Sequence, residues 1–134
     1  MKAHLYHIQL NVSDPNFYRD LLNQLDYKII DQGPEWLGAT DGQTDLWIMR
    51  TDQAYEAMPY HRKACGINHL AFTVGSSEEV DRFCAEFLVP RKIATLYDTP
   101  RRFPEYHPEY YAVYFEDPDR IKLEVVYRPP LDTV

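Results

Sequence analysis

Three residues of the sequence have types and positions suited to holding a metal ion. His7 and His69 each open a short run of alternating apolar and polar or small residues, and Glu124 lies in the run 121–126, whose other residues are apolar except for Lys122. A carboxylate in such a run is costly to bury unless it is paired or bound to a cation. Two imidazoles and a carboxylate can bind one side of a divalent metal and leave positions open for substrate. A hydrogen-bonded polar cluster without metal is the alternative that these residues leave open.

The two histidines stand at matching places of a weak internal repeat. The segments His7–Val12 and His69–Val74 lie close to half the chain length apart, and both alternate with period two. This alternation is typical of a strand with one apolar face and one polar face. If the two halves pack with pseudo-twofold symmetry, their polar faces line one shared cavity, in which the two histidines converge.

The elements around the histidines repeat as well. A helix is predicted at Pro15–Gln24 with Ser13 as its cap, and another at Ser77–Leu88 with a capping box at Ser76–Glu79. Three short strands are predicted after each helix: Tyr27–Gln32, Trp36–Thr40 and Thr44–Arg50, then Ile93–Asp98, Tyr110–Glu116 and Ile121–Tyr127. Each half therefore has the order strand, helix, strand, strand, strand.

Length and composition exclude several classes of function. The chain has 134 residues, enough for one domain or two half-domains, with 45% hydrophobic and 26% charged residues. A net charge of −7 argues against nucleic acid and acidic membranes as partners. No long apolar window and no leader-like start are present, and the two cysteines form no CxxC pair. A cytoplasmic location is expected. Cys84 lies on the apolar stripe of its predicted helix and is expected to be a core residue.

Two stretches of the sequence, Gly66–Phe72 and Tyr114–Glu124, carry a resemblance to a known family, and the opening strand with the Phe17–Asp20 helix supports it. The chain resembles the vicinal oxygen chelate superfamily, which includes glyoxalase I, extradiol dioxygenases, fosfomycin-modifying thiol transferases, methylmalonyl-CoA epimerase and bleomycin-binding proteins. The resemblance covers nearly the whole chain. In the family the second stretch usually contains DPDG, whereas this chain has Arg120 in place of the glycine, which is expected to alter the turn.

The resemblance implies an α+β fold of two tandem βαβββ modules that form a curved mixed sheet around a shared metal-centred cavity. Module one is placed at about 1–51, a linker at about 52–64, module two at about 65–128 and a C-terminal tail at 129–134. His61 falls in the linker, where a histidine is usually solvated. The family often forms dimers, and a homodimer is expected by resemblance alone.

The resemblance also assigns the site residue by residue. His7, His69 and Glu124 match metal ligands, and Tyr114 falls where dioxygenases and fosfomycin-modifying enzymes carry a tyrosine near the metal. A phenol there can donate a hydrogen bond to a metal-bound oxygen or act as an acid. The alternative for Tyr114 is an ordinary strand aromatic in a chain with 11 tyrosines.

One expected ligand has no counterpart. Members with four ligands, such as glyoxalase I, carry another carboxylate in the last strand of module one, and the alignment places Trp47 there. Asp45 is predicted to reach that position only after a shift in register that changes its face. The remaining set is like that of extradiol dioxygenases and fosfomycin-modifying enzymes.

Further candidates lie around the predicted cavity. Thr99–Glu109, with three prolines, is predicted to be a long loop that decides the substrate. From it His107 is a candidate acid or base, and Arg101 and Arg102 are candidates for binding an anionic substrate. Gln9 shares a face with His7 and is a candidate for substrate binding.

Two classes of function follow. The first is an enzyme in which Fe, Mn, Ni, Zn or Co is chelated by two adjacent oxygens of a small-molecule substrate and acts as a Lewis acid. Its reaction could be of the glyoxalase type (a lyase or isomerase), an extradiol-type ring cleavage, or a fosfomycin-type thiol transfer. The second is a non-catalytic protein that binds a bleomycin-like drug. Retention of all three ligand candidates favours the enzyme.

Overall fold

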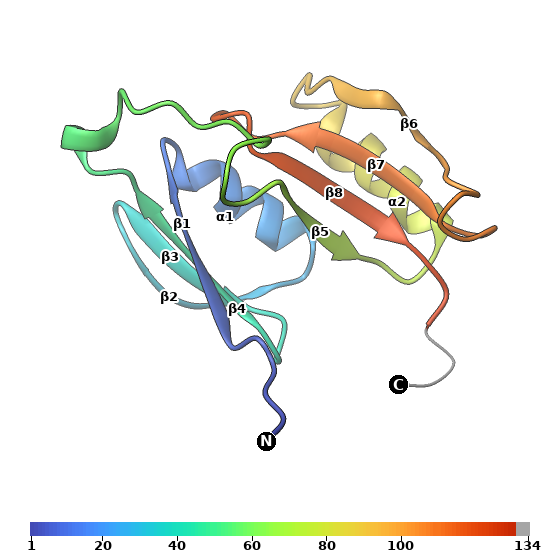
Figure 1. The fold of residues 1–134 in the computed structure, drawn as a ribbon, viewed down its shortest axis with the longest axis horizontal. Helices are drawn as coiled ribbons and strands as arrows, with labels where there is room; N and C mark the ends of the chain where they lie inside the picture. Colours follow the sequence, from blue (N-terminus) through green and yellow to red (C-terminus); the bar gives the residue numbers. More distant parts are fainter. Residues whose placement is uncertain (131–134) are drawn as a thin grey trace. The chain divides into compact units, whose positions relative to one another are not determined.

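The computed structural model describes residues 1–130 in two compact units, Met1–Pro59 and the part beginning at Tyr60. Each unit contains a four-stranded mixed sheet with a helix against one face (Figure 1). The predicted α+β class and the βαβββ order of each module are confirmed. The last four residues of the predicted tail, 131–134, lie outside the described residues. Within residues 1–130, no helix is both long and apolar enough to cross a membrane.

The first unit holds the first repeat. Its elements are β1 (His7–Val12), α1 (Pro15–Gln24), β2 (Lys28–Gly33), β3 (Trp36–Thr40), β4 (Asp45–Arg50) and a short 3-10 helix, η1 (Gln53–Tyr55). The sheet order is β1-β4-β3-β2, in which β1 and β4 are parallel and the other pairs antiparallel. Successive side chains along each strand point alternately to the face that packs on α1 and to an open face, as the period-two pattern predicts.

Helix α1 packs into the core of the first unit and begins at a capped proline. Tyr18, Leu21 and Leu22 of α1 are fully buried. The N-cap is Asp14, whose side chain accepts a hydrogen bond of 3.1 Å from the backbone N–H two residues on. The predicted cap at Ser13 is wrong, because proline occupies the first helical position and the cap is the residue directly before it.

The second unit repeats the order. Its elements are β5 (His69–Thr73), α2 (Ser77–Phe83), a π-helical turn η2 (Cys84–Leu88), β6 (Thr95–Arg102), β7 (Tyr111–Glu116) and β8 (Lys122–Tyr127), with sheet order β5-β8-β7-β6. The predicted second helix is therefore one α-helical and one π-helical segment. Its predicted cap is present, since the Ser76 hydroxyl accepts from the Glu79 N–H at 3.2 Å.

The predicted loop Thr99–Glu109 begins too early, because its first four residues belong to β6. The pairing of β6 with β7 shifts in register between Leu96 and Arg101. There the buried hydroxyl of Thr99 accepts from the Tyr114 N–H at 3.0 Å and donates to the Leu96 carbonyl at 2.6 Å. A side chain thus replaces the missing ladder contacts, and the strand continues past a proline that would otherwise interrupt it.

Both faces of the second sheet are covered. On the helix side, Phe83 and Phe87 stack on each other, and Phe83 also meets Phe115 of β7. On the other side, a smaller buried cluster joins the loop after β6 to the sheet; its members are Phe103, Ala112, Tyr114 and Val126, with Leu96 and Tyr110 against them. This second cluster covers the sheet face that carries Glu124.

Candidate metal centre

His69 and Glu124 come together because of the register between β5 and β8. These strands are parallel, with His69 opposite Lys122 and Ala71 opposite Glu124. Residues two apart in a strand, and residues opposite each other in neighbouring strands, lie on one face of a sheet. His69, Lys122 and Glu124 therefore share the face that turns away from α2.

The contact between the two predicted ligands is direct. Nε2 of His69 lies 3.3 Å from Oε1 of Glu124, and the Glu124 side chain is only 2% exposed, against 35% for His69. A buried carboxylate needs charge compensation and hydrogen bonds to remain ionised. The half-exposed imidazole beside it is open to a ligand or substrate on one side.

Tyr110 satisfies the second oxygen of the same carboxylate. Its hydroxyl donates to Oε2 of Glu124 at 2.6 Å. Burial, and then the hydrogen bond and charge of Glu124, raise the pKa of Tyr110, so the phenol stays protonated and remains a donor. Sequence analysis missed this residue, because it is only one of many aromatics at the edge of a predicted strand.

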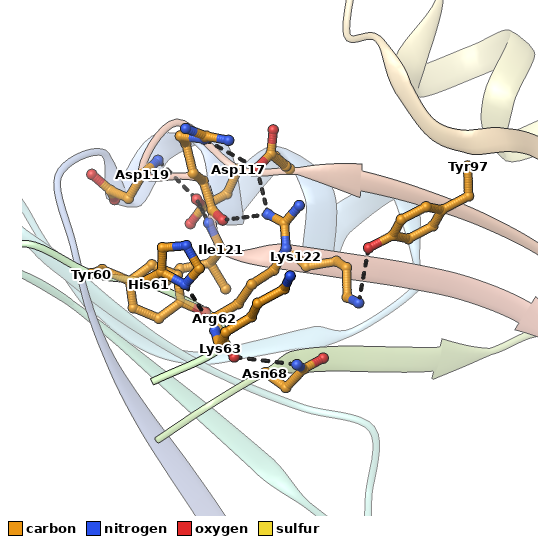
Figure 2. Close-up of polar contacts among 12 residues, drawn as sticks. Tyr60, His61, Arg62, Lys63, Asn68, Tyr97, Asp117, Asp119, Ile121 and Lys122 are labelled. Atoms are coloured by element: carbon orange, nitrogen blue, oxygen red, sulfur yellow. Dashed lines mark hydrogen bonds and ion pairs between the residues drawn. The ribbon is translucent and has the colours of Figure 1, made fainter. Parts of the chain in front are cut away.

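Asn68 holds the other side of the imidazole. Its Oδ1 lies 2.8 Å from Nδ1 of His69, and its Nδ2 donates to the Arg62 carbonyl at 3.2 Å (Figure 2). Because Nδ2 of the amide donates to that carbonyl, the amide oxygen is the atom that faces His69. This oxygen can only accept a hydrogen bond, so Nδ1 of His69 carries the proton that it accepts. In the neutral ring, Nε2 then presents a lone pair towards Glu124.

This arrangement fits a metal ion. A lone pair and a carboxylate oxygen at 3.3 Å repel each other unless a proton or a cation lies between them. Two metal bonds of about 2.1 Å that meet at about 100° would set their donor atoms about 3.2 Å apart. The donor set, its spacing and the amide that orients the imidazole are compatible with a pair of metal ligands. Within the described part of this unit, no third His, Cys, Asp or Glu joins the pair.

Tyr114 lies beside the pair. It is opposite Glu124 in the β7–β8 ladder, and its ring stands edge-on to His69 with centroids 6.0 Å apart. Burial first, and then the negative charge of Glu124, raise the pKa of Tyr114. Its phenol is therefore neutral and suited to donating a hydrogen bond rather than to acting as a base.

A cation lies on the same face. Lys122 donates from Nζ to the Tyr97 hydroxyl at 3.2 Å and stands 5.2 Å and 5.6 Å from the ring centroids of Tyr97 and Tyr114. The hydrogen bond from Lys122 is the main cause that lowers the pKa of Tyr97. Neither residue was found from the sequence, since a lysine at a strand's start usually faces solvent.

Three other candidates lie on the exposed hairpin of β6 and β7. His107 accepts at Nδ1 from a backbone N–H at 3.0 Å, and Arg101 and Arg102 donate to backbone carbonyls at 3.2 Å and 3.3 Å. In residues 1–130, no hydrogen bond or ion pair joins any of them to His69 or Glu124. Their contacts stabilise the hairpin, and their roles towards substrate stay predictions.

The first unit carries His7 and Gln9 on the open face of β1. They lie opposite Asp45 and Trp47 of β4, as their counterparts in β5 lie opposite Lys122 and Glu124 in β8. Trp47 thus occupies the position that Glu124 holds in the second unit, as the alignment predicts. The prediction that Asp45 changes face is wrong, because it lies two residues from Trp47 and shares its face.

Proteins of known structure and sequence resemble this chain over most of its length. No family model matches the chain. It is 33% identical over 126 residues to the uncharacterized protein YqjT of Bacillus subtilis, covering 91% of this chain and 97% of that protein. A crystal structure of a candidate glyoxalase from Bacillus halodurans is 34% identical, with a TM-score of 0.81, covering 92% of this chain and 95% of that one. This chain belongs to the vicinal oxygen chelate superfamily.

A further superfamily structure shares the fold at lower identity. The fosfomycin resistance protein FosX of Listeria monocytogenes, solved with Mn(II) and sulfate, is 24% identical, with a TM-score of 0.68. It covers 96% of this chain and 93% of that one. At this identity the likeness establishes the architecture only.

The turn before β8 places Arg120 in a backbone conformation that favours glycine. Arg120 has φ of 67°, the left-handed conformation that glycine adopts without cost. The Asp117 carboxylate accepts from the backbone N–H groups of Asp119 and Ile121, both at 2.8 Å, and so closes the turn. Arg120 therefore carries backbone strain at the position where the superfamily usually has glycine.

Proposed function

We propose that this chain is a divalent-metal-dependent enzyme acting on a small molecule, with His7, His69 and Glu124 as the metal ligands. The observation that supports it best is the 3.3 Å approach of the His69 imidazole to the buried Glu124 carboxylate, with the imidazole oriented from behind by Asn68. Membership of the superfamily supports the same class of protein, and FosX, which shares the fold, has been solved with Mn(II).

His7 enters the proposal through the repeat. His7 begins β1 as His69 begins β5. Each histidine lies two residues before the one that is opposite Trp47 in β4 or Glu124 in β8. The third imidazole would come from His7 of the same chain or, in a homodimer, from that of a second copy. Fe, Mn, Ni, Zn and Co all suit two imidazoles and a carboxylate.

The chain's own residues have separate tasks in this proposal. The metal, when bound, would supply Lewis-acid polarisation of two adjacent substrate oxygens. Tyr114, a neutral phenol beside His69, would donate a hydrogen bond to a substrate oxygen that gains negative charge. Tyr110 and Asn68 would act as positioning residues that hold Glu124 and His69.

The presence of Trp47 in place of a fourth carboxylate ligand favours some reaction types of the superfamily over others. Trp47 fills the position corresponding to Glu124, so the first unit offers no carboxylate there. A three-ligand set favours extradiol-type ring cleavage or fosfomycin-type thiol transfer over the isomerisation of four-ligand glyoxalases, all within the broader glyoxalase/dioxygenase type.

The test is the metal content of the purified protein, measured by mass spectrometry beside four variants. Wild type is expected to hold about one divalent ion per chain. His7→Ala, His69→Ala and Glu124→Ala are expected to lose it with their circular dichroism unchanged. His4→Ala, an exposed histidine near the same strand, is the matched control and should retain the ion.

Each outcome has a meaning for the proposal. Iron would indicate ring cleavage, nickel or zinc glyoxalase-like chemistry, and manganese either ring cleavage or thiol transfer. A wild-type protein that holds no metal and takes none up on titration would contradict the proposal. The non-catalytic binding of a bleomycin-like drug would then be the better interpretation.

A further inference from the structure

A pocket in the second unit has basic walls, which is unusual in a chain with a net charge of −7. It encloses about 240 Å³, and it is lined by Tyr60, His61, Arg62, Lys63 and Arg120. Three of these five side chains carry a positive charge and none is a carboxylate. Residues 60–63 come from the segment before β5 (Figure 2). Arg120 comes from the turn before β8.

Glu116 orients the two arginines of this basic pocket from behind. Its Oε2 accepts from Nη1 of Arg62 at 2.6 Å and from Nε of Arg120 at 3.3 Å. The Arg62 side chain is only 20% exposed, so its guanidinium is held in place. A guanidinium has five N–H donors, and each arginine therefore keeps donors for a ligand after this contact.

The carboxylates of the neighbouring turn do not line the pocket. Asp117 is 5% exposed, and its carboxylate accepts from two backbone N–H groups of its own turn. Asp119 follows it in the same turn (Figure 2). Glu116, Asp117 and Asp119 together balance the three cations locally, but none of these three carboxylates lines the pocket.

Of the two remaining wall residues, His61 adds a neutral donor. Nδ1 of His61 accepts from the Lys63 N–H at 3.0 Å, so in the neutral ring the proton lies on Nε2. The Tyr60 hydroxyl donates to the Ile67 carbonyl at 2.8 Å, which ties the segment to the start of β5. Sequence analysis treats His61 as a solvated linker residue, whereas the structure places it in a pocket wall.

We propose that this basic pocket binds an anionic group, a phosphate, phosphonate or carboxylate, carried by a small molecule. Converging guanidinium and ammonium donors are the chemistry that recognises such groups. A volume of about 240 Å³ holds the anionic group and several further atoms, given that a water molecule takes up about 30 Å³ of liquid. The proposal does not depend on the metal site, because none of the residues that line the pocket is a proposed metal ligand.

The test is a titration followed by the NMR shifts of the backbone amides of residues 60–63 and 120. The probes are inorganic phosphate, methylphosphonate and acetate, each at an ionic strength held constant with sodium chloride. Wild type is compared with Lys63→Gln, Arg120→Gln and the double variant. Arg82→Gln, an exposed arginine of α2, is the matched control.

We expect saturable shifts with at least one probe, and the strongest probe identifies the source of the anionic group. Each single variant should weaken binding about three- to fivefold, and the double variant more than about tenfold, because each removes one charge-assisted contact. The control should bind as wild type does. Shifts no larger than those from chloride, an unchanged affinity in the double variant, or an equal loss in the control would overturn the proposal.

Discussion

The Asn68 side chain fixes which nitrogen of His69 is free, through the 2.8 Å contact between Oδ1 and Nδ1. The Arg62 carbonyl fixes the amide in turn, at 3.2 Å from its Nδ2. The lone pair of the imidazole is thereby directed to the side where Glu124 lies. Asn68 is therefore expected to affect metal affinity although it is not itself a proposed metal ligand.

Asn68→Ala is expected to weaken metal binding about 10- to 100-fold, as is usual when a residue that orients a ligand is lost. The measurement is a competition titration against a chelator of known affinity. Asn16→Ala, an exposed asparagine in α1, is the control and should bind as wild type does. Equal affinity in all three proteins would show that the imidazole needs no orientation from behind.

Tyr110→Phe is expected to destabilise the metal-free protein by about 1–3 kcal/mol, since it leaves one oxygen of a buried carboxylate without its donor. The free energy of unfolding in urea measures the effect. Tyr106→Phe, in the same loop but exposed, should change it by less than about 0.5 kcal/mol. If both variants lose the same stability, the hydroxyl of Tyr110 has no special role.

The sequence predicted those parts of the fold that local patterns determine. The bounds of α1 and β1 agree with the structure, because a proline at the helix start and strict alternation in the strand leave little choice there. The repeat and the carboxylate in a largely apolar strand also singled out His69 and Glu124, whose side chains the structure places in contact. These signals are present in the sequence and need no knowledge of which strands pair.

The missed features depend on contacts between segments far apart in the chain. Tyr110 and Lys122 acquire their roles only when β6, β7 and β8 pair, and Thr99 stabilises a strand through a register shift that no local pattern encodes. The basic pocket likewise joins the segment before β5 to Arg120, which lies more than 50 residues further along the chain. Such juxtapositions follow from tertiary structure and were not available from periodicity.

Arg120→Gly is expected to stabilise the protein by about 1 kcal/mol, the cost of placing a side chain in the left-handed conformation. The contact with Glu116 that it removes is worth little, because the Arg120 side chain is 80% exposed. Urea unfolding measures the change. Arg120→Ala keeps the strain and removes only the guanidinium, so a gain in this variant as well would refute the explanation.

Tyr111 is expected to make stability fall at alkaline pH. Its hydroxyl donates to Asp81 at 2.6 Å, and burial followed by that carboxylate raises its pKa to about 12. The unfolded chain ionises the phenol near about pH 10, so the contribution is complete below that value and is lost as the pH rises towards about 12. Unfolding free energies measured across this range should fall less steeply in Tyr111→Phe.

The control for this pH dependence is Tyr55→Phe, which removes an exposed hydroxyl. Its unfolding free energy should follow the wild-type curve at every pH. A Tyr111→Phe curve parallel to that of wild type above about pH 10 would mean that Asp81 does not hold the phenol in its neutral form.

The two cysteines are expected to differ in their reaction with iodoacetamide. Cys65 is exposed, whereas Cys84 is half-buried in η2, where burial, and then the charge of Asp81, raise its pKa to about 11. At about pH 8 only about one Cys84 thiol in a thousand is ionised, and the thiolate is the reacting form. Mass spectrometry of the Cys65→Ser variant should show slow labelling that rises about tenfold per pH unit. Rapid labelling at about pH 8 would show instead that the π-helical turn opens and exposes Cys84 to solvent.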